Sequence, residues 1–114
     1  MPYLKIQTNV DLPAAETENL LKAASKAVAE ALGKPERYVM VAVEGGRPIV
    51  FSGQSAPAAF LELKSIGLPE NRTSDLSSAL CALMKSALDV PEDRVYIEFA
   101  NAKGGLWGWN GGTF

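Results

Sequence analysis

The chain has 114 residues, of which 47% are hydrophobic and 21% charged; this suits one globular domain with its own core and excludes a disordered chain. Its net charge of −2, with Lys and Arg scattered among acids, gives no electrostatic reason to bind nucleic acid or an anionic membrane surface. The chain has no histidine and one cysteine, which excludes an intrachain disulfide, histidine-dependent catalytic pairs and the usual zinc sites, so we expect neither metal nor cofactor.

The first half of the chain predicts a strand, a helix and a second strand. Residues 3–8 alternate between apolar and polar, which is typical of a strand with one buried face. A helix opens at Asp11-Leu12-Pro13, where proline is tolerated in the first turn, and its apolar residues recur on one face at positions 20, 21, 24, 27, 28, 31 and 32. Gly33-Lys34-Pro35 ends this helix, and an apolar strand follows from Tyr38 to Val43.

The second half predicts the same order of elements after a linking segment. In that segment, Glu44 to Pro48 is typical of a turn and Ile49 to Phe51 of a short strand. Residues 60–64 alternate as the first strand does, and the cluster from Asn71 to Ser74 predicts a cap for a helix with apolar residues at 76, 79, 80, 83, 84, 87 and 88. Residues 91–99 then give a proline stop and a final strand.

The two halves read as copies of one βαβ unit. The motif Leu32-x-x-Pro35-Glu36 recurs as Leu88-x-x-Pro91-Glu92, and nearly the same interval separates the first strands of the two halves. Any small α/β protein alternates its elements, but the matching intervals favour pseudo-repeats at about 1–57 and 58–114 within a single domain. We therefore expect an α/β (α+β) fold in which two right-handed βαβ units form one four-stranded mixed sheet with both helices on one face.

The predicted sheet has one apolar face and one mixed face. The residues expected to pack under the helices are Leu4, Ile6, Val39, Val41, Val43, Leu61, Leu63, Val95, Ile97 and Phe99, and those expected on the opposite face are Lys5, Gln7, Met40, Ala42, Glu62, Lys64, Tyr96 and Glu98. No element remains to cover the mixed face, and sheets with parallel strand pairs are rarely left bare on one side. Burial against other subunits is the simplest remedy, so we expect an oligomer.

The Gly-rich tail from Lys103 to Phe114 carries three large aromatic side chains. Exposing Trp107, Trp109 and Phe114 to water is costly, so we expect the tail to dock as a hairpin against its own subunit or the next one. These rings suit an aromatic pocket and subunit packing equally well, and the sequence leaves both open. Cys81 falls in the apolar stripe of the second helix and is expected to be a small core residue.

Met1-Pro2 is the first candidate for catalysis. Removal of methionine before a residue as small as proline would leave Pro2 as a secondary amine at the chain start. An α-amino group has a pKa of about 8, and burial lowers this pKa because apolar surroundings disfavour the charged form. A neutral amine at physiological pH is suited to general base catalysis. A proline at position two is, by itself, a weak signal.

Three further residues have both a structural and a functional interpretation. Lys34 follows the first helix, where a cation stabilises the helix C-terminus, or it holds a substrate carboxylate. Tyr96 and Glu98 share one face of the last strand, which suits either a subunit interface or a binding site. The sequence contains no P-loop, dinucleotide fingerprint or metal-ligand cluster that would indicate another chemistry.

Short segments along essentially the whole chain match one known family at similar spacing. They are Met1-Pro2, Thr8-Asn9-Val10, Gly33-Lys34-Pro35 with Tyr38, Ser65-Ile66-Gly67, Asn71-Arg72, Leu80-Cys81, Asp93-Arg94-Val95-Tyr96-Ile97, Gly108-Trp109-Asn110 and Thr113-Phe114. Together they resemble the macrophage migration inhibitory factor family and its tautomerase relatives.

This resemblance implies a homotrimer, a trimeric tautomerase-like barrel in which the sheets line a central channel and the active sites lie between subunits. It implies that Pro2 is the catalytic base and that Lys34, with the backbone of Ile66, binds the polar end of the substrate. The other residues that it implies around the substrate are Tyr38, Trp109 and Phe114 and, from the neighbouring subunit, Tyr96 and Glu98.

The implied reaction is keto–enol tautomerisation of small phenylpyruvate-like or dopachrome-like molecules. Two alternatives stay open. One is a non-catalytic, cytokine-like or host-mimicking binding protein. The other is a proline-dependent dehalogenase or decarboxylase of the same superfamily; such enzymes usually need arginines near the proline, and the candidates here are Arg37, Arg47, Arg72 and Arg94.

The sequence departs from the animal cytokines of this family at two places. Ala58-Ala59-Phe60-Leu61 stands where they carry Cys-x-x-Cys, so we expect no thiol oxidoreductase activity. Glu98 stands where they commonly have Asn, and its carboxylate would repel a substrate acid. We therefore expect lower activity on the usual aromatic test compounds.

The start of the chain shows no signal peptide and no membrane-spanning segment. It lacks a charged stretch followed by an apolar run, and no apolar segment approaches the ~20 residues that cross a bilayer. We expect a soluble cytoplasmic protein. The resemblance adds non-classical secretion as an alternative, because animal relatives leave cells without a signal peptide.

Overall fold

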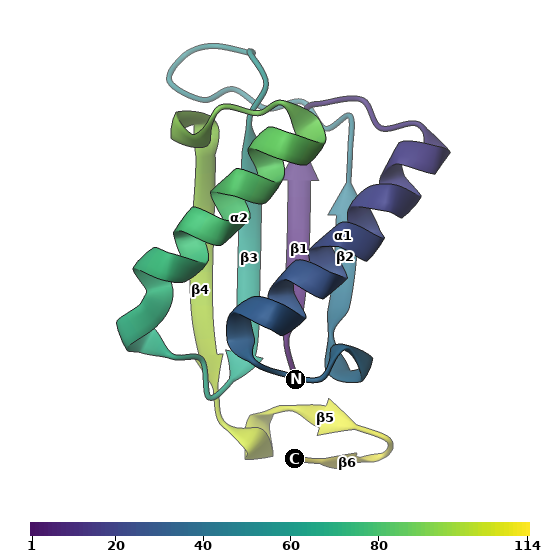
Figure 1. The fold of residues 1–114 in the computed structure, drawn as a ribbon, viewed down its shortest axis with the longest axis vertical. Coiled ribbons are helices and arrows are strands. Elements are labelled where there is room, and N and C mark those ends of the chain that lie inside the picture. Colours follow the sequence, from purple (N-terminus) through teal and green to yellow (C-terminus); the bar gives the residue numbers. More distant parts are fainter.

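The computed structural model describes residues 1–114 and is drawn as a ribbon in Figure 1. The helices and strands in chain order are β1 (Tyr3–Thr8), α1 (Ala14–Leu32), β2 (Met40–Glu44), β3 (Ala59–Ile66), α2 (Thr73–Leu88), β4 (Val95–Ala102), β5 (Gly108–Trp109) and β6 (Gly112–Thr113). Short 3-10 turns lie at Glu36–Tyr38, Glu70–Arg72, Glu92–Arg94 and Gly104–Leu106.

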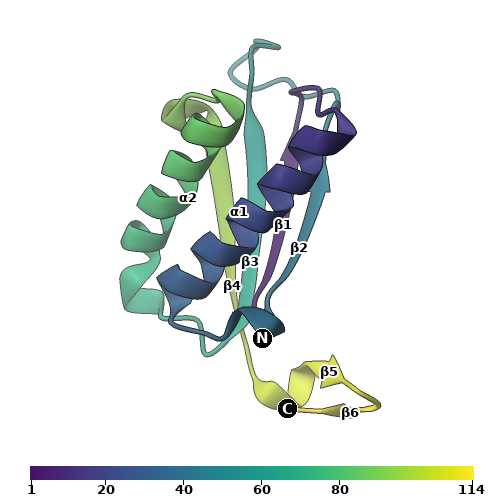
Figure 2. The same ribbon diagram turned by 45° about the vertical axis from the view of Figure 1, so that its right-hand side comes forward.

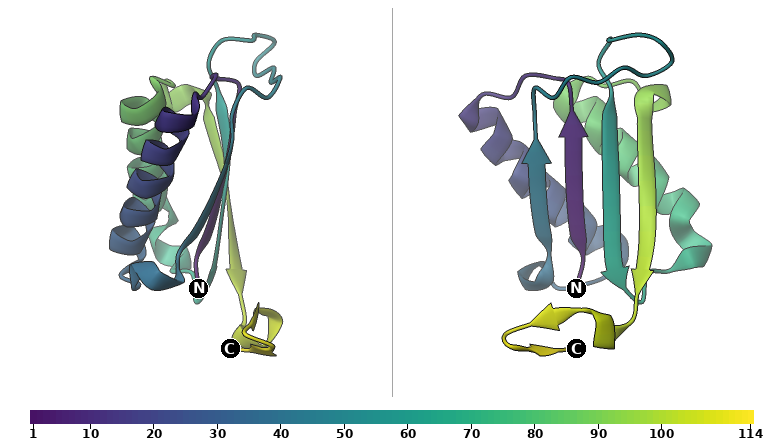
Figure 3. Two further views of the ribbon diagram at one scale, coloured as in Figure 1. Left: turned by 90° about the vertical axis from the view of Figure 1, so that its right-hand side faces the viewer. Right: turned by 180° about the vertical axis from the view of Figure 1, so that it is seen from behind.

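The first four strands form one sheet in the order β2-β1-β3-β4. β1 is parallel to β2 and antiparallel to β3, and β3 is parallel to β4. A helix joins the strands of each parallel pair, so β1-α1-β2 and β3-α2-β4 are two βαβ units. The right-hand view of Figure 3 shows all four strands side by side. The predicted mixed sheet is confirmed.

Both helices lie on the same face of the sheet, as Figures 2 and 3 show, and the core lies between the two layers. Leu4 and Ile6 of β1 are fully buried there, as Leu61 and Leu63 of β3 are, which confirms the predicted alternation. The buried helix residues above them are Leu20, Ala24, Val28, Leu76, Leu80, Met84 and Leu88. Because each large apolar side chain removed from water contributes about 1.5–3 kcal/mol, this layer fixes the sheet under the helices.

The outer strands and Cys81 complete the core from its edges. The residues predicted to face the helices from the β2 and β4 sides, Val39, Val41, Val43, Ile97 and Phe99, are half-buried against the same cluster, and Val95 is buried in it. Cys81 is half-buried there as well, in agreement with its expected packing role.

The ends of the two helices depend on different local signals. α1 ends at Gly33, whose φ of 64° is in the left-handed region that glycine adopts at little cost. The side-chain cap predicted between Asn71 and Ser74 is wrong, because no side chain caps α2. The turn at Glu70–Arg72 runs straight into the helix, and Thr73 already has helical backbone angles.

Residues 49–51 do not form the predicted strand. Phe51 makes a single bridge with Gln54, and the segment stays a loop at the far end of the sheet. The backbone carbonyls of this loop accept hydrogen bonds from the Arg94 guanidinium. The donor–acceptor distances are 2.9, 3.1, 3.2 and 3.0 Å for Pro57, Phe51, Gln54 and Ala56. Because a side chain distant in sequence takes these acceptors, no neighbouring strand is needed.

The sheet face opposite the helices carries no further element of this chain (Figure 3). Met40 and Tyr96 on this face are 66% and 64% exposed, although both are large and apolar in part. Lys5 and Glu62 lie opposite each other on β1 and β3, and Glu62 lies opposite Glu98 on β4, so the face is mixed, as predicted. Neither helix has the length and apolar character that crossing a membrane requires.

Candidate active site

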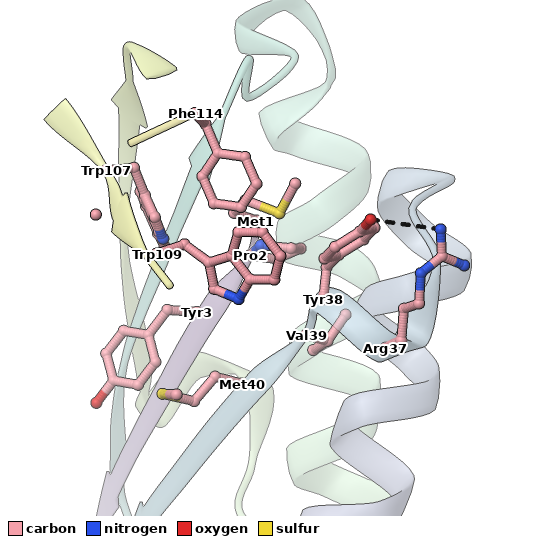
Figure 4. Close-up of a pocket in the computed structure, with 11 residues that line it drawn as sticks. Met1, Pro2, Tyr3, Arg37, Tyr38, Val39, Met40, Trp107, Trp109 and Phe114 are labelled. Atoms are coloured by element: carbon pink, nitrogen blue, oxygen red, sulfur yellow. Dashed lines mark hydrogen bonds between the residues drawn. The ribbon is translucent and has the colours of Figure 1, made fainter. Parts of the chain in front are cut away.

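Pro2 lies buried directly before β1, at one end of the central strand pair. Its backbone carbonyl accepts a hydrogen bond from the Met40 N–H at 3.0 Å, which fixes the chain start against β2. A cavity of about 500 Å³ opens beside it (Figure 4). The residues that line this cavity are Met1, Pro2, Tyr3, Arg37, Tyr38, Val39, Met40, Trp107, Gly108, Trp109 and Phe114.

The amine at the chain start has an unusual environment. Burial lowers the pKa of the Met1 amine below its ordinary value of 8.0, and the positive charge of Lys34 lowers this pKa further. Both causes disfavour the protonated form. With Met1 in place the Pro2 nitrogen belongs to a peptide bond and carries no basic lone pair. The same surroundings would act on the imino group of Pro2 if Met1 were removed.

Lys34 and Ile66 lie together, as the sequence analysis expects. Gly33 ends α1 and turns the chain, which directs Lys34 toward the end of β3. The Lys34 ammonium donates a hydrogen bond to the Ile66 carbonyl oxygen at 2.7 Å. This bond links the first βαβ unit to the second and holds a positive charge close to the chain start. Neither residue belongs to the lining of the cavity itself.

The aromatic walls come from two segments that are distant in sequence. Tyr38 lies in the turn Glu36–Tyr38 rather than in β2, which begins at Met40, two residues later than the predicted strand. Trp109 and Phe114 belong to the tail, whose β5–β6 hairpin confirms the predicted hairpin. Their rings are stacked with centres 5.4 Å apart. The hairpin lies beyond the end of the sheet, next to the N-terminus (Figure 1).

Tyr96 and Glu98 do not reach this cavity within one chain. Tyr96 pairs with Phe60, which pairs with Gln7, whereas Pro2 adjoins Tyr3 at the other end of β1. Four positions along a strand correspond to ~13 Å at about 3.3 Å per residue. Tyr96 instead packs against the Phe51 ring, with centres 4.6 Å apart. Glu98 is exposed and forms no ion pair.

Arg37 is the charged residue of the cavity that the sequence did not single out. Of the four arginines considered, Arg37 lines the cavity, whereas Arg47, Arg72 and Arg94 do not. Its guanidinium carbon lies 4.6 Å from the centre of the Tyr38 ring. The one signal for it in the sequence is its position next to Tyr38. Tyr3, Val39 and Met40 also line the cavity without having been predicted there, and Trp107 lines it as one of the three rings considered for an aromatic pocket.

Known proteins resemble this chain over its full length. Residues 1–114 match the family described as macrophage migration inhibitory factor (MIF). The chain is 40% identical to a macrophage migration inhibitory factor homolog of Brugia malayi, with 100% of this chain and 99% of the relative covered. It is also 40% identical to a homolog of Trichuris trichiura, covering 100% of both chains.

Solved structures share the fold. The crystal structure of a macrophage migration inhibitory factor homologue from Prochlorococcus marinus matches with a TM-score of 0.92 and 42% identity, covering 98% of each chain. The structure of the factor from Trichinella spiralis matches with a TM-score of 0.90 and 35% identity, covering 98% of this chain and 99% of that one. From its match over residues 1–114 and these full-length relatives, the chain belongs to the macrophage migration inhibitory factor family, and it has the fold of the tautomerase superfamily.

Proposed function

We propose that this protein is a keto–enol tautomerase whose general base is the imino nitrogen of Pro2, exposed by removal of Met1. One observation carries the proposal: Pro2 is buried at a cavity of aromatic and apolar side chains, in surroundings that lower the pKa of the chain-start amine. A lowered pKa increases the neutral fraction of such an amine at physiological pH, and the neutral form is the one that accepts a proton. The chain needs no metal or cofactor for this step.

The proposed reaction moves one proton and changes no oxidation state. Pro2 removes a proton from the carbon beside the substrate carbonyl; the C–H electrons form the enol double bond and the carbonyl oxygen becomes negative. The protonated imino group then returns the proton to that oxygen, which completes the enol. Lys34 offsets the negative charge on the carboxylate or on the enolate, and it is held for this by the Ile66 carbonyl. The reverse reaction uses the same groups.

We also propose that the working form is a homotrimer with its sites between subunits. Two observations support this: the exposed sheet face with Met40 and Tyr96, and the absence of Tyr96 and Glu98 from the lining of the cavity within one chain. A neighbouring subunit would bring Tyr96 and Glu98 to the cavity whose walls include Tyr38, Trp109 and Phe114. The substrate is a small keto or enol acid of the phenylpyruvate type.

Intact mass combined with turnover tests the base. Protein lacking Met1 should interconvert the enol and keto forms of phenylpyruvate, followed by ultraviolet absorbance of the enol. Protein that retains Met1 has the same side chains but an amide nitrogen at Pro2. Its kcat/KM should therefore fall by at least roughly 100-fold, the usual contribution of a general base. Pro2→Gly replaces the secondary amine with a primary amine and loses the ring, and most turnover should be lost with it.

Two results would overturn the proposal. One is equal turnover by the processed and Met1-retaining forms, which would exclude the imino group as the base. The other is an absence of turnover on every enol acid tried by processed, trimeric protein, which is what the alternative of a non-catalytic binding protein predicts. Halogenated acrylates run beside the enol acids distinguish a dehalogenase from a tautomerase.

A further inference from the structure

The cavity beside Pro2 contains one charged side chain, that of Arg37, and no acidic side chain. The rest of its lining is largely apolar and aromatic. Arg37 forms no ion pair with any acid of the chain. A cation without an ion-pair partner at an apolar cavity attracts negatively charged ligands to it. The cavity is therefore suited to an anion in addition to an apolar group.

The guanidinium of Arg37 is held in place but has donors to spare. Its carbon lies 4.6 Å from the centre of the Tyr38 ring, and one terminal nitrogen lies 3.4 Å from the Tyr38 hydroxyl (Figure 4). Stacking on an aromatic ring limits the rotation of a long side chain. A guanidinium has five N–H donors, and apart from that one long contact those of Arg37 meet no acceptor of the chain. Two adjacent donors match the two oxygens of a carboxylate.

Arg37 lines the cavity, whereas Lys34 does not. Lys34 is engaged with the Ile66 carbonyl and acts on the chain-start amine. In Figure 4, Tyr38 lies between Pro2 and the Arg37 guanidinium. One cation is thus beside the proposed reacting group, and the other lies beyond an aromatic wall. A single carboxylate next to the reacting carbon leaves Arg37 without a partner.

We propose that Arg37 binds a second anionic group, at the end of the substrate away from the reacting carbonyl. The substrate class is then a dianionic keto or enol acid with an aromatic or extended apolar middle, for which a cavity of about 500 Å³ has room. The assignment of the reacting end rests on the proposed tautomerase function. The preference of the cavity for a second anion does not rest on that function, because it depends only on Arg37 and on the side chains that line the cavity.

Binding of inert ligands tests the preference without turnover. Cinnamate carries one carboxylate and 4-carboxycinnamate carries two, and both are titrated by quenching of the Trp107 and Trp109 fluorescence in processed protein. The wild type should bind the dianion roughly fivefold or more tightly than the monoanion, as an exposed charge pair with matched geometry allows. Arg37→Gln should abolish this ratio and Arg37→Lys should keep part of it. Lys26→Gln, which removes the same charge from an exposed position of α1 outside the cavity, should leave the ratio unchanged.

The outcomes separate this proposal from the one on which it partly rests. Two results would show that Arg37 does not bind a second anionic group. One is a wild type that binds the dianion no more tightly than the monoanion, and the other is an equal loss of affinity for both ligands in Arg37→Gln. The titrations are repeated in Glu98→Gln, which removes the carboxylate proposed to come from a neighbouring subunit, and the ratio must persist there. With phenylpyruvate and 4-carboxyphenylpyruvate, KM should show the same ratio. If the wild type keeps the preference for the dianion but turns over no substrate, the proposed tautomerase function is refuted while the proposed anion site at Arg37 is supported.

Discussion

Gly104 is the residue whose replacement should damage the cavity most specifically. A Cβ added at Gly104 would lie 2.8 Å from the backbone oxygen of Phe114 and 3.1 Å from its carbonyl carbon. Ordinary van der Waals contact begins at about 3.4 Å, so Phe114 has to move outward by roughly 0.6 Å in Gly104→Ala. Phe114 stacks on Trp109, and both rings line the cavity, so the shift opens one of its walls.

The expected loss is in substrate binding rather than in overall stability. Overpacking by one methyl group costs about 1–3 kcal/mol, but the hairpin relieves it by moving away from the cavity. KM for phenylpyruvate should therefore rise about three- to tenfold, with a change in the free energy of unfolding of less than ~1 kcal/mol. Gly105→Ala is the matched control, because a Cβ there has no atom within 4 Å. An equal KM in the two variants would refute this account of the wall.

Three further predictions concern the base and the fold. The kcat/KM should rise with pH and level off above a midpoint below 8.0, because the base acts when neutral; Lys34→Met should move that midpoint to higher pH, since it removes a charge that lowers the pKa of the amine. A midpoint that moved to lower pH would contradict this sign. In urea unfolding, Arg94→Met should lose ~2–4 kcal/mol with its four bonds to loop carbonyls, whereas Arg72→Met, with one contact of 3.5 Å to a carbonyl, should lose less than ~0.5 kcal/mol. Leu61→Ala, at a fully buried position between the sheet and the helices, should lose ~2–5 kcal/mol; a loss below ~1 kcal/mol would show that the core relaxes around it.

The sheet and both helices could be predicted because their signals are local. β1 and β3 alternate between apolar and polar residues, and each helix carries an apolar stripe. Both patterns indicate burial on one face and can be recognised directly in the sequence. The loop around Phe51 could not be predicted in the same way. Its conformation depends on Arg94, some 40 positions later, and no local pattern records that the loop carbonyls have this partner.

The cavity, too, combines residues that could be predicted from the sequence with residues that could not. Pro2, Tyr38, Trp109 and Phe114 were expected together from the family resemblance, and the structure places all four on one cavity. Composition and spacing alone do not bring them together, because the contact depends on how the tail crosses the end of the sheet. Arg37 was one of four equivalent arginines in the sequence. Arg37 is distinguished from the others by the short turn Glu36–Tyr38, which places it beside Tyr38 in the lining of the cavity.

Both ends of the polypeptide lie at this one cavity, since Met1 and Phe114 are among its lining residues. Any peptide fused to either end would therefore emerge beside the bound molecule and compete with it for space. Affinities measured on end-tagged protein would report the tag together with the site.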